Sequence, residues 1–157
     1  MKLDTIDLRI LAELQADGSL SNVELARRVH LSPSPCLARA KALEAAGVIQ
    51  RYVALANAAA LGLGLNVFIS ISLKTQSKEA LAAFEQSIAE HDQVMECYLM
   101  TGDSDYLIRV AVADISALER FILDQLTPIP GIEKIRTSFT LKQVRYKTAL
   151  PLPAARG

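Results

Sequence analysis

The spacing of apolar residues changes once along the chain, close to Gly47. Before this glycine, apolar residues recur at the spacing expected for the buried side of an α-helix. After it, short stretches typical of β-strands alternate with further helical stretches. We therefore expect two domains of different class, and a chain of 157 residues with 51% hydrophobic content has enough apolar material for two small cores.

The N-terminal part predicts three short helices. The first covers residues 4–16. Ser21 and Glu24 have the spacing of a capping box, which predicts the start of the second helix. Ser32 is a favourable N-cap for the third helix, and Gly47 ends it. Three helices with a tight connection between the second and the third are the arrangement of a helix-turn-helix.

The C-terminal part predicts alternating strands and helices. The expected elements are a strand at 66–73, a helix at 78–90, strands at 94–100 and 106–113, a helix at 116–126 and a strand at 132–144. This β-α-β-β-α-β order is the ferredoxin-like plan, a four-stranded antiparallel sheet with two helices on one face. The fold class is therefore α+β.

We divide the chain into a helix-turn-helix domain (residues 1–52), a hinge (53–64) and a ferredoxin-like domain (65–157). The strand at 106–113 is apolar on nearly both faces, which a sheet with one face in water does not need. We therefore expect the face away from the helices to pack on another subunit.

Charge and composition exclude several classes of protein. Lysine and arginine number 17, aspartate and glutamate also 17, so bulk charge does not hold this chain on nucleic acid or on a membrane. No apolar stretch approaches the roughly 18 residues that cross a bilayer, so we expect a cytoplasmic protein without a membrane partner. Neither a phosphate-binding loop nor a constellation of catalytic residues is present, so we do not expect an enzyme.

The two cysteines, Cys36 and Cys97, lie far apart and outside any CxxC or Cys/His cluster. This spacing predicts neither a disulfide framework nor a metal site. We expect both thiols to be buried and reduced, and we expect no metal ion or cofactor.

One face of the third helix has the chemistry of a major-groove surface. Small residues allow close approach, a hydroxyl reaches base edges, and cations contact guanine or phosphate. Basic residues outnumber acidic ones locally, although a solvated bundle face has the same composition. The candidate DNA-binding residues are Arg27, Arg28, Ser32, Ser34, Ala38, Arg39 and Lys41.

Four parts of the sequence match the pattern of one known family. They are residues 3–11 (first helix), 31–44 with 47–49 (recognition helix), 100–107 (a G-x-x-D-Y/F effector loop), and 137–142 with 148–152 (leucine-responsive branch). Over essentially its whole length, the sequence thus resembles the Lrp/AsnC family of bacterial and archaeal regulators. Ala42 stands where relatives often have another basic residue, which implies lower DNA affinity or a different base preference.

The resemblance implies a transcription factor with double-stranded DNA and an amino-acid effector as partners. In such proteins a hinge strand joins the helix-turn-helix to a ferredoxin-like domain, which dimerises through its sheets and binds the amino acid between dimers. Homodimers that assemble into tetramers or octamers are common in the family.

The resemblance also implies an effector site in and near the loop between the two central strands. An amino acid needs N–H donors for its carboxylate and an acceptor for its ammonium group. Backbone amides of residues 102–104 provide the first, and Asp103 or Asp105 the second, unless both aspartates only make turn hydrogen bonds. Tyr106 either contacts ligand or packs at the dimer interface. The candidate effector-binding residues are Met100, Thr101, Gly102, Asp103, Ser104, Asp105, Tyr106, Thr137 and Ser138.

An apolar or flexible pocket favours a leucine-like or methionine-like effector, but the sequence does not select one. Two other functions remain open. The first alternative is an architectural protein that wraps DNA without an effector. The second is a ligand-binding module with weak DNA binding. DNA binding with little sequence preference and no ligand effect indicates the first, and ligand binding without DNA binding indicates the second.

Overall fold

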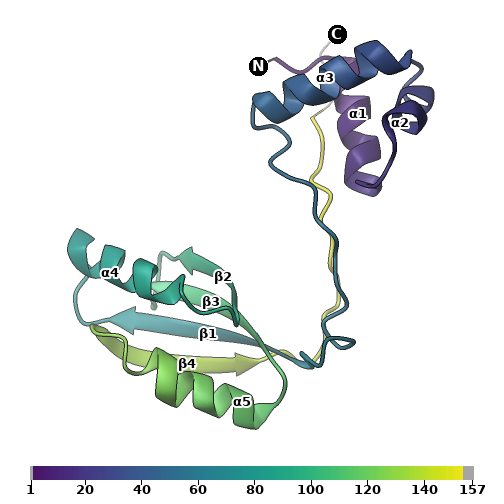
Figure 1. Ribbon diagram of the computed structural model, residues 1–157. Helices are drawn as coiled ribbons and strands as arrows, with labels where there is room; N and C mark the ends of the chain where they lie inside the picture. Colours follow the sequence, from purple (N-terminus) through teal and green to yellow (C-terminus); the bar gives the residue numbers. More distant parts are fainter. Residues whose placement is uncertain (1, 154–157) are drawn as a thin grey trace. The chain divides into compact units, whose positions relative to one another are not determined.

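The computed structural model describes residues 2–153, which form two compact units (Figure 1). The first unit combines residues 2–55 with 144–153, and the second contains residues 56–143. The division therefore differs from the expected one, because the segment 144–153 packs with the helical unit and not with the ferredoxin-like domain. Each unit is described by itself below.

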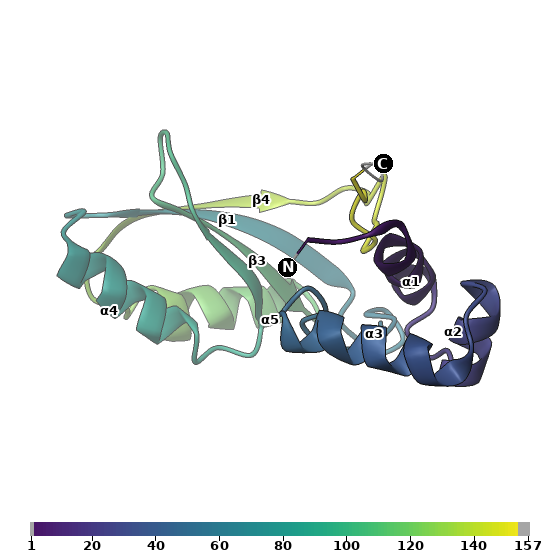
Figure 2. The same ribbon diagram turned by 90° about the horizontal axis from the view of Figure 1, so that it is seen from above.

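The first unit contains the helices α1 (Thr5–Ala16), α2 (Asn22–Arg28) and α3 (Pro33–Ala45), as the apolar spacing predicts (Figure 2). All three contribute buried apolar residues to one core. These residues are Leu8, Ile10, Leu11, Leu25, Ala26, Val29, Cys36 and Leu43. The helix-turn-helix arrangement is therefore confirmed.

The helix starts differ in their capping. Ser21 accepts a hydrogen bond from the backbone N–H of Glu24 at 3.2 Å, as expected. The carboxylate of Glu24 binds two arginines of α2, so the predicted reciprocal box is only half formed. A complete box occurs instead at the start of α1, where Asp4 and Asp7 each accept a hydrogen bond from the other residue's backbone N–H.

The C-terminal segment is attached to α1 by two hydrogen bonds between the side-chain amide of Gln15 and the backbone of Leu150. The amide of Gln15 accepts a hydrogen bond from the N–H of Leu150 at 2.6 Å and donates one to its carbonyl at 3.2 Å. A glutamine amide has one acceptor oxygen and N–H donors, so it pairs with a peptide group as a neighbouring strand does. Leu152 then packs against the helical core. The chain therefore returns to the helical core at Leu152, and residues 154–157 lie outside the described part.

The second unit has the predicted β-α-β-β-α-β order. Its elements are β1 (Leu65–Leu73), α4 (Lys78–Ile88), β2 (Val94–Leu99), β3 (Tyr106–Val112), α5 (Ile115–Arg120), a π-helical turn η1 (Phe121–Leu126) and β4 (Ile132–Phe139). The antiparallel sheet has the strand order β2-β3-β1-β4, and α4 and α5 lie on one of its faces (Figures 1 and 2). The single helix expected at 116–126 is thus an α-helix that continues as a π-helical turn, and the last strand ends at Phe139.

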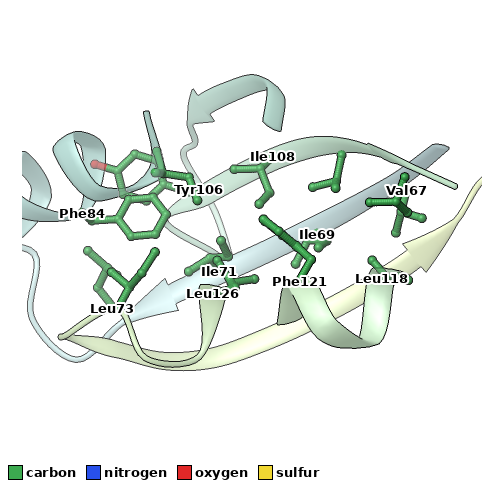
Figure 3. Close-up of a cluster of buried hydrophobic side chains, with 14 residues drawn as sticks. Val67, Ile69, Ile71, Leu73, Phe84, Tyr106, Ile108, Leu118, Phe121 and Leu126 are labelled. Atoms are coloured by element: carbon green, nitrogen blue, oxygen red, sulfur yellow. The ribbon is translucent and has the colours of Figure 1, made fainter. Parts of the chain in front are cut away.

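The core of this unit lies between the sheet and its two helices (Figure 3). Alternate residues of β1 and β3 are buried, as expected when one face of a strand points inward. Tyr106 is 1% exposed, and its ring lies 4.5 Å from that of Phe84, measured between centroids. Figure 3 shows Phe84 and Tyr106 side by side at one end of this core.

The opposite face of the sheet carries apolar side chains that this chain leaves half-buried. Because residues alternate between faces, Leu107 and Ala111 of β3 point away from the helices, and so does Phe68 of β1. Arg109 lies among them and pairs with Glu96 of β2 at 2.9 Å. This face is therefore mixed in polarity, because Asn66, Ser70 and Ser72 of β1 point outward beside Phe68.

The cysteines differ in exposure. Cys36 is fully buried in the helical core, as expected, whereas Cys97 is exposed. The expectation for Cys97 is wrong because its side chain lines an open cavity beside the edge strand β2 and is not packed into the core. Within residues 2–153, no helix is long and apolar enough to cross a bilayer.

We expect replacement of His30 by glycine to stabilise the protein. His30 follows α2 with a φ of 59°, a conformation that costs a residue with a Cβ on the order of 1 kcal/mol. Part of this gain is offset by the greater freedom of glycine in the unfolded chain, so we expect a net rise of roughly 0.5 kcal/mol in the free energy of unfolding. Chemical denaturation checks the sign, with His30→Val as the opposite control. A destabilised His30→Gly variant would contradict this account.

We expect Leu152→Ala to destabilise the helical unit by roughly 1–2 kcal/mol, since it removes apolar contacts with the core. Leu150→Ala is the matched control in the same segment. The side chain of Leu150 is 73% exposed, while its backbone makes the bonds to Gln15. Equal stability losses in both variants, measured by urea denaturation, would show that Leu152 has no special role.

Candidate DNA-binding and effector-binding sites

The outward face of α3 is open. Ser34, Ala38 and Lys41 are exposed, whereas Cys36 and Ala40 on the other side are buried. Among the described residues, the side chain of Lys41 has no hydrogen-bond or ion-pair partner. The exposed face therefore combines a hydroxyl, a small residue and a cation, a combination that fits into a major groove.

The start of α3 adds a further hydroxyl. Ser32 occupies the N-cap position, and its side chain makes no capping hydrogen bond. Pro33 follows at the first helical position, where it has no N–H to satisfy. The Ser32 hydroxyl is therefore available to an external acceptor such as a phosphate oxygen.

The two arginines of α2 are already paired within the chain. The Glu24 carboxylate binds Arg27 at 2.6 Å and Arg28 at 2.9 Å, and Arg28 also reaches Glu13 at 3.1 Å. Hydrogen bonds from Arg27 and then from Arg28 lower the pKa of Glu24 to about 2. These pairs are exposed and therefore weak, so a phosphate group can replace the carboxylate.

Arg39 turns back toward α1. Its Nη1 atom lies 2.7 Å from a carboxylate oxygen of Asp4 and 2.7 Å from one of Asp7. Hydrogen bonds to Arg39 contribute to the lowered pKa of Asp4, after the larger effect of the backbone N–H of Asp7. Arg39 is a predicted DNA-binding residue at the edge of the outward face, and in this chain its partners are two carboxylates of the same unit.

The connection between β2 and β3 is a closed loop that extends beyond the sheet (Figure 2). The N–H of Met100 donates to the carbonyl of Asp105 at 2.8 Å, which closes the loop. Gly102 has a φ of +132°, which side-chain-bearing residues rarely adopt, while no other group lies within 4 Å of the place its Cβ would take. Glycine is thus needed for the backbone path. Thr101 and Asp103 are exposed at the same loop, and Ser104 is half-buried.

Asp105 attaches this loop to the sheet. One of its carboxylate oxygens, Oδ2, accepts a hydrogen bond from the N–H of Leu73 at 2.7 Å and a longer one, 3.5 Å, from Gln76. Its own N–H donates to the carbonyl of Ile71 at 2.9 Å. The other oxygen has no partner among the described residues. Asp105 therefore makes a structural hydrogen bond and keeps one acceptor free.

The remaining candidate effector-binding residues are not gathered around the loop in this chain. Tyr106 points into the core, and its hydroxyl donates to Glu85 at 2.7 Å. Burial, followed by the hydrogen bond to Glu85, raises its pKa, so it stays a neutral donor. Thr137 and Ser138 pair with the middle of β1, whereas the loop is bonded to the end of that strand. One protomer therefore does not bring β4 and the loop into a single site.

A small cavity of about 280 Å³ lies between α4 and β2. Its lining includes Tyr106, Glu85 and Cys97, together with apolar residues. Partial burial and the Glu85 charge raise the pKa of the Cys97 thiol, so it is not an activated nucleophile. Among residues 2–153, no group of three or more His, Cys, Asp or Glu side chains is arranged to hold a metal ion.

The sequence analysis missed the carboxylates that hold the arginines, namely Asp4, Asp7, Glu13 and Glu24. The spacing of Asp4 and Asp7 carried a usable signal, because an acidic residue three positions after an N-cap can complete a capping box. The bonds from Asp105 to β1 gave no local signal, since the two segments are far apart in the sequence.

Family comparisons agree with both halves of the chain. Residues 3–50 match the model described as winged helix-turn-helix DNA-binding, and residues 66–150 match the model described as the Lrp/AsnC ligand binding domain. The Bkd operon transcriptional regulator of Pseudomonas aeruginosa is 44% identical over 96% of this chain and 99% of its own length. The leucine-responsive regulatory protein of Escherichia coli is 40% identical over 94% of this chain and 90% of its own length.

Solved structures give the same result. A transcriptional regulator of Neisseria meningitidis in complex with L-Met superimposes with a TM-score of 0.91 at 41% identity, covering 96% of this chain and 97% of the other. An AsnC family regulator of Agrobacterium tumefaciens gives a TM-score of 0.90 at 38% identity, covering 95% and 97%. The relatives are transcriptional regulators and not enzymes, and the expected DNA-binding and ligand-binding domains are both present. The chain belongs to the Lrp/AsnC family of DNA-binding transcriptional regulators, whose second domain binds amino acids.

Proposed function

We propose that this protein binds operator DNA through the outward face of α3, and that an amino acid with an apolar side chain changes its DNA binding or its assembly. The observation that carries the DNA half is the exposure of Ser34, Ala38 and Lys41 on one side of a helix whose other side is buried. Ser32, Arg27 and Arg28 contact phosphates at the margin of this surface. Operator DNA as the partner supports a cytoplasmic location.

The effector loop supplies both kinds of group that an α-amino acid needs. Backbone N–H groups of residues 102–104 bind the carboxylate, and the free oxygen of Asp105 accepts from the ammonium group. The L-Met complex of the Neisseria relative and the leucine-responsive relatives favour leucine or methionine as effector. Met100, exposed beside the loop, provides an apolar and adaptable contact for either side chain.

The site is completed by a second copy of the chain. Thr137 and Ser138 lie away from the loop of their own protomer, so another protomer brings such residues to it. The half-buried apolar residues Phe68, Leu107 and Ala111 on the open face of the sheet support dimerisation through the sheet, and tetramers or octamers form from the dimers. A ligand bound between copies acts by favouring one assembly over another.

We expect Lys41→Gln to weaken operator binding roughly tenfold without lowering thermal stability, because Lys41 is exposed and has no described partner in the chain. If Lys41 neutralises a phosphate, the slope of log affinity against log salt becomes shallower by about 0.9 per protomer. Fluorescence anisotropy at several salt concentrations measures both. Lys142→Gln is the control, since Lys142 is exposed in the other unit. Unchanged affinity and slope in Lys41→Gln would remove α3 from the interface.

We expect Asp105→Asn to abolish the amino-acid response while leaving basal DNA binding intact. Asparagine keeps an acceptor for the N–H of Leu73 but loses the charge that attracts an ammonium group. Calorimetric titration with L-leucine and L-methionine, together with anisotropy, tests this. Asp103→Asn is the matched control, because Asp103 is exposed in the same loop. A full response in Asp105→Asn and its loss in Asp103→Asn would assign the ammonium contact to Asp103.

A further inference from the structure

The helix α3 contributes few side chains to the buried core of its unit. Its buried residues are Cys36, Ala40 and Leu43, of which two are small. Burial of apolar surface is non-directional, so small residues fix the distance between helices better than the rotation of either one. A base-reading surface needs that rotation to be fixed, because it decides which side chains face the groove.

A directional contact is present at the edge of this apolar stripe. The Nη1 atom of Arg39 bridges Asp4 and Asp7, with both distances at 2.7 Å. Every oxygen of the two carboxylates is used. Asp4 Oδ1 accepts from the N–H groups of Ile6 and Asp7, and Asp7 Oδ2 accepts from the N–H of Asp4. The N-terminal cap of α1 is thus also the docking point of α3.

Burial of Asp7 favours the orientation of α3 in which Arg39 contacts this carboxylate. The Asp7 side chain is 6% exposed, against 52% for Asp4 and 34% for Arg39. A buried carboxylate without its cation retains an uncompensated cost of desolvation, so states in which Arg39 has moved away are disfavoured. The positive end of the α1 dipole also favours carboxylates at this position.

We propose that Asp7 is a positioning residue for DNA recognition, which acts through Arg39 to hold α3 in its reading orientation. This inference rests on the proposed DNA interface on α3. It gives an acidic residue a favourable role in binding a polyanion, and it makes Arg39 a structural link and not a phosphate contact.

The sign of one measurement separates this proposal from simple electrostatics. Removing a negative charge near DNA strengthens binding if charge alone matters. We expect Asp7→Asn instead to weaken operator binding about tenfold in the full-length protein, at a temperature where circular dichroism shows the variant folded. Asp17→Asn is the matched control, because it removes the same charge from an exposed position at the other end of α1. Stronger or unchanged binding by Asp7→Asn would overturn the proposal.

Salt dependence and a double-mutant cycle test the part played by Arg39. We expect Arg39→Gln to weaken binding about tenfold with an unchanged slope of log affinity against log salt, in contrast to Lys41→Gln. The double variant Asp7→Asn/Arg39→Gln should bind no more weakly than either single variant, since both break one link. A slope reduced as in Lys41→Gln, or losses that add, would make Arg39 an independent DNA contact and overturn the proposal.

Two further measurements separate failure of the Asp7 proposal from failure of the proposed α3 interface. Arg39→Lys keeps the charge, but its single ammonium group does not reproduce the guanidinium geometry, so we expect it to bind weakly with a wild-type slope. This variant tests the proposal even if Asp7→Asn does not fold. If the wild-type protein does not bind operator DNA, or if Lys41→Gln binds as the wild type does, the proposed α3 interface itself is wrong, whatever Asp7→Asn does.

Discussion

The attachment of α3 to α1 is the constraint on which the proposed DNA interface depends. Ser34, Ala38 and Lys41 lie on the side of α3 opposite to Cys36 and Leu43, which are buried in the core. Apolar burial supplies most of the stability of this packing but little direction. The contact from Arg39 to the cap of α1 adds direction, so the residues that start one helix also orient another.

In the second unit, the core lies on one face of the sheet. The opposite face and the loop between β2 and β3 remain available for contacts with other molecules. Residues of β1 and β3 that point toward α4 and α5 are fully buried, and their neighbours on the open face, which are both apolar and polar, are half-buried. The loop between β2 and β3 is bonded to the end of β1 through Asp105. Because β1 pairs with a strand on each side, the loop is attached to the centre of the sheet, and a ligand bound there as we propose would act on that strand.

Sequence reasoning predicted the parts of this structure that depend on local patterns. The types of the two domains, the order of their elements and the buried side of α3 follow from apolar spacing and capping residues. It did not predict contacts between distant residues, such as Gln15 with Leu150, Arg39 with Asp7, or Asp105 with Leu73. These depend on tertiary packing, which brings together groups with no shared local pattern. For the same reason, the exposure of Cys97 on an edge strand and the docking of the C-terminal segment were not expected.

In the proposed function, one chain joins DNA recognition to the sensing of an amino acid. The most direct test is fluorescence anisotropy on DNA from upstream of the protein's own gene, at two salt concentrations, with and without each of the twenty amino acids. The account predicts salt-sensitive binding that exceeds binding to scrambled DNA, and that changes with leucine or methionine. Specific binding that no amino acid alters would contradict the effector half, and binding equal to that of scrambled DNA would contradict the DNA half.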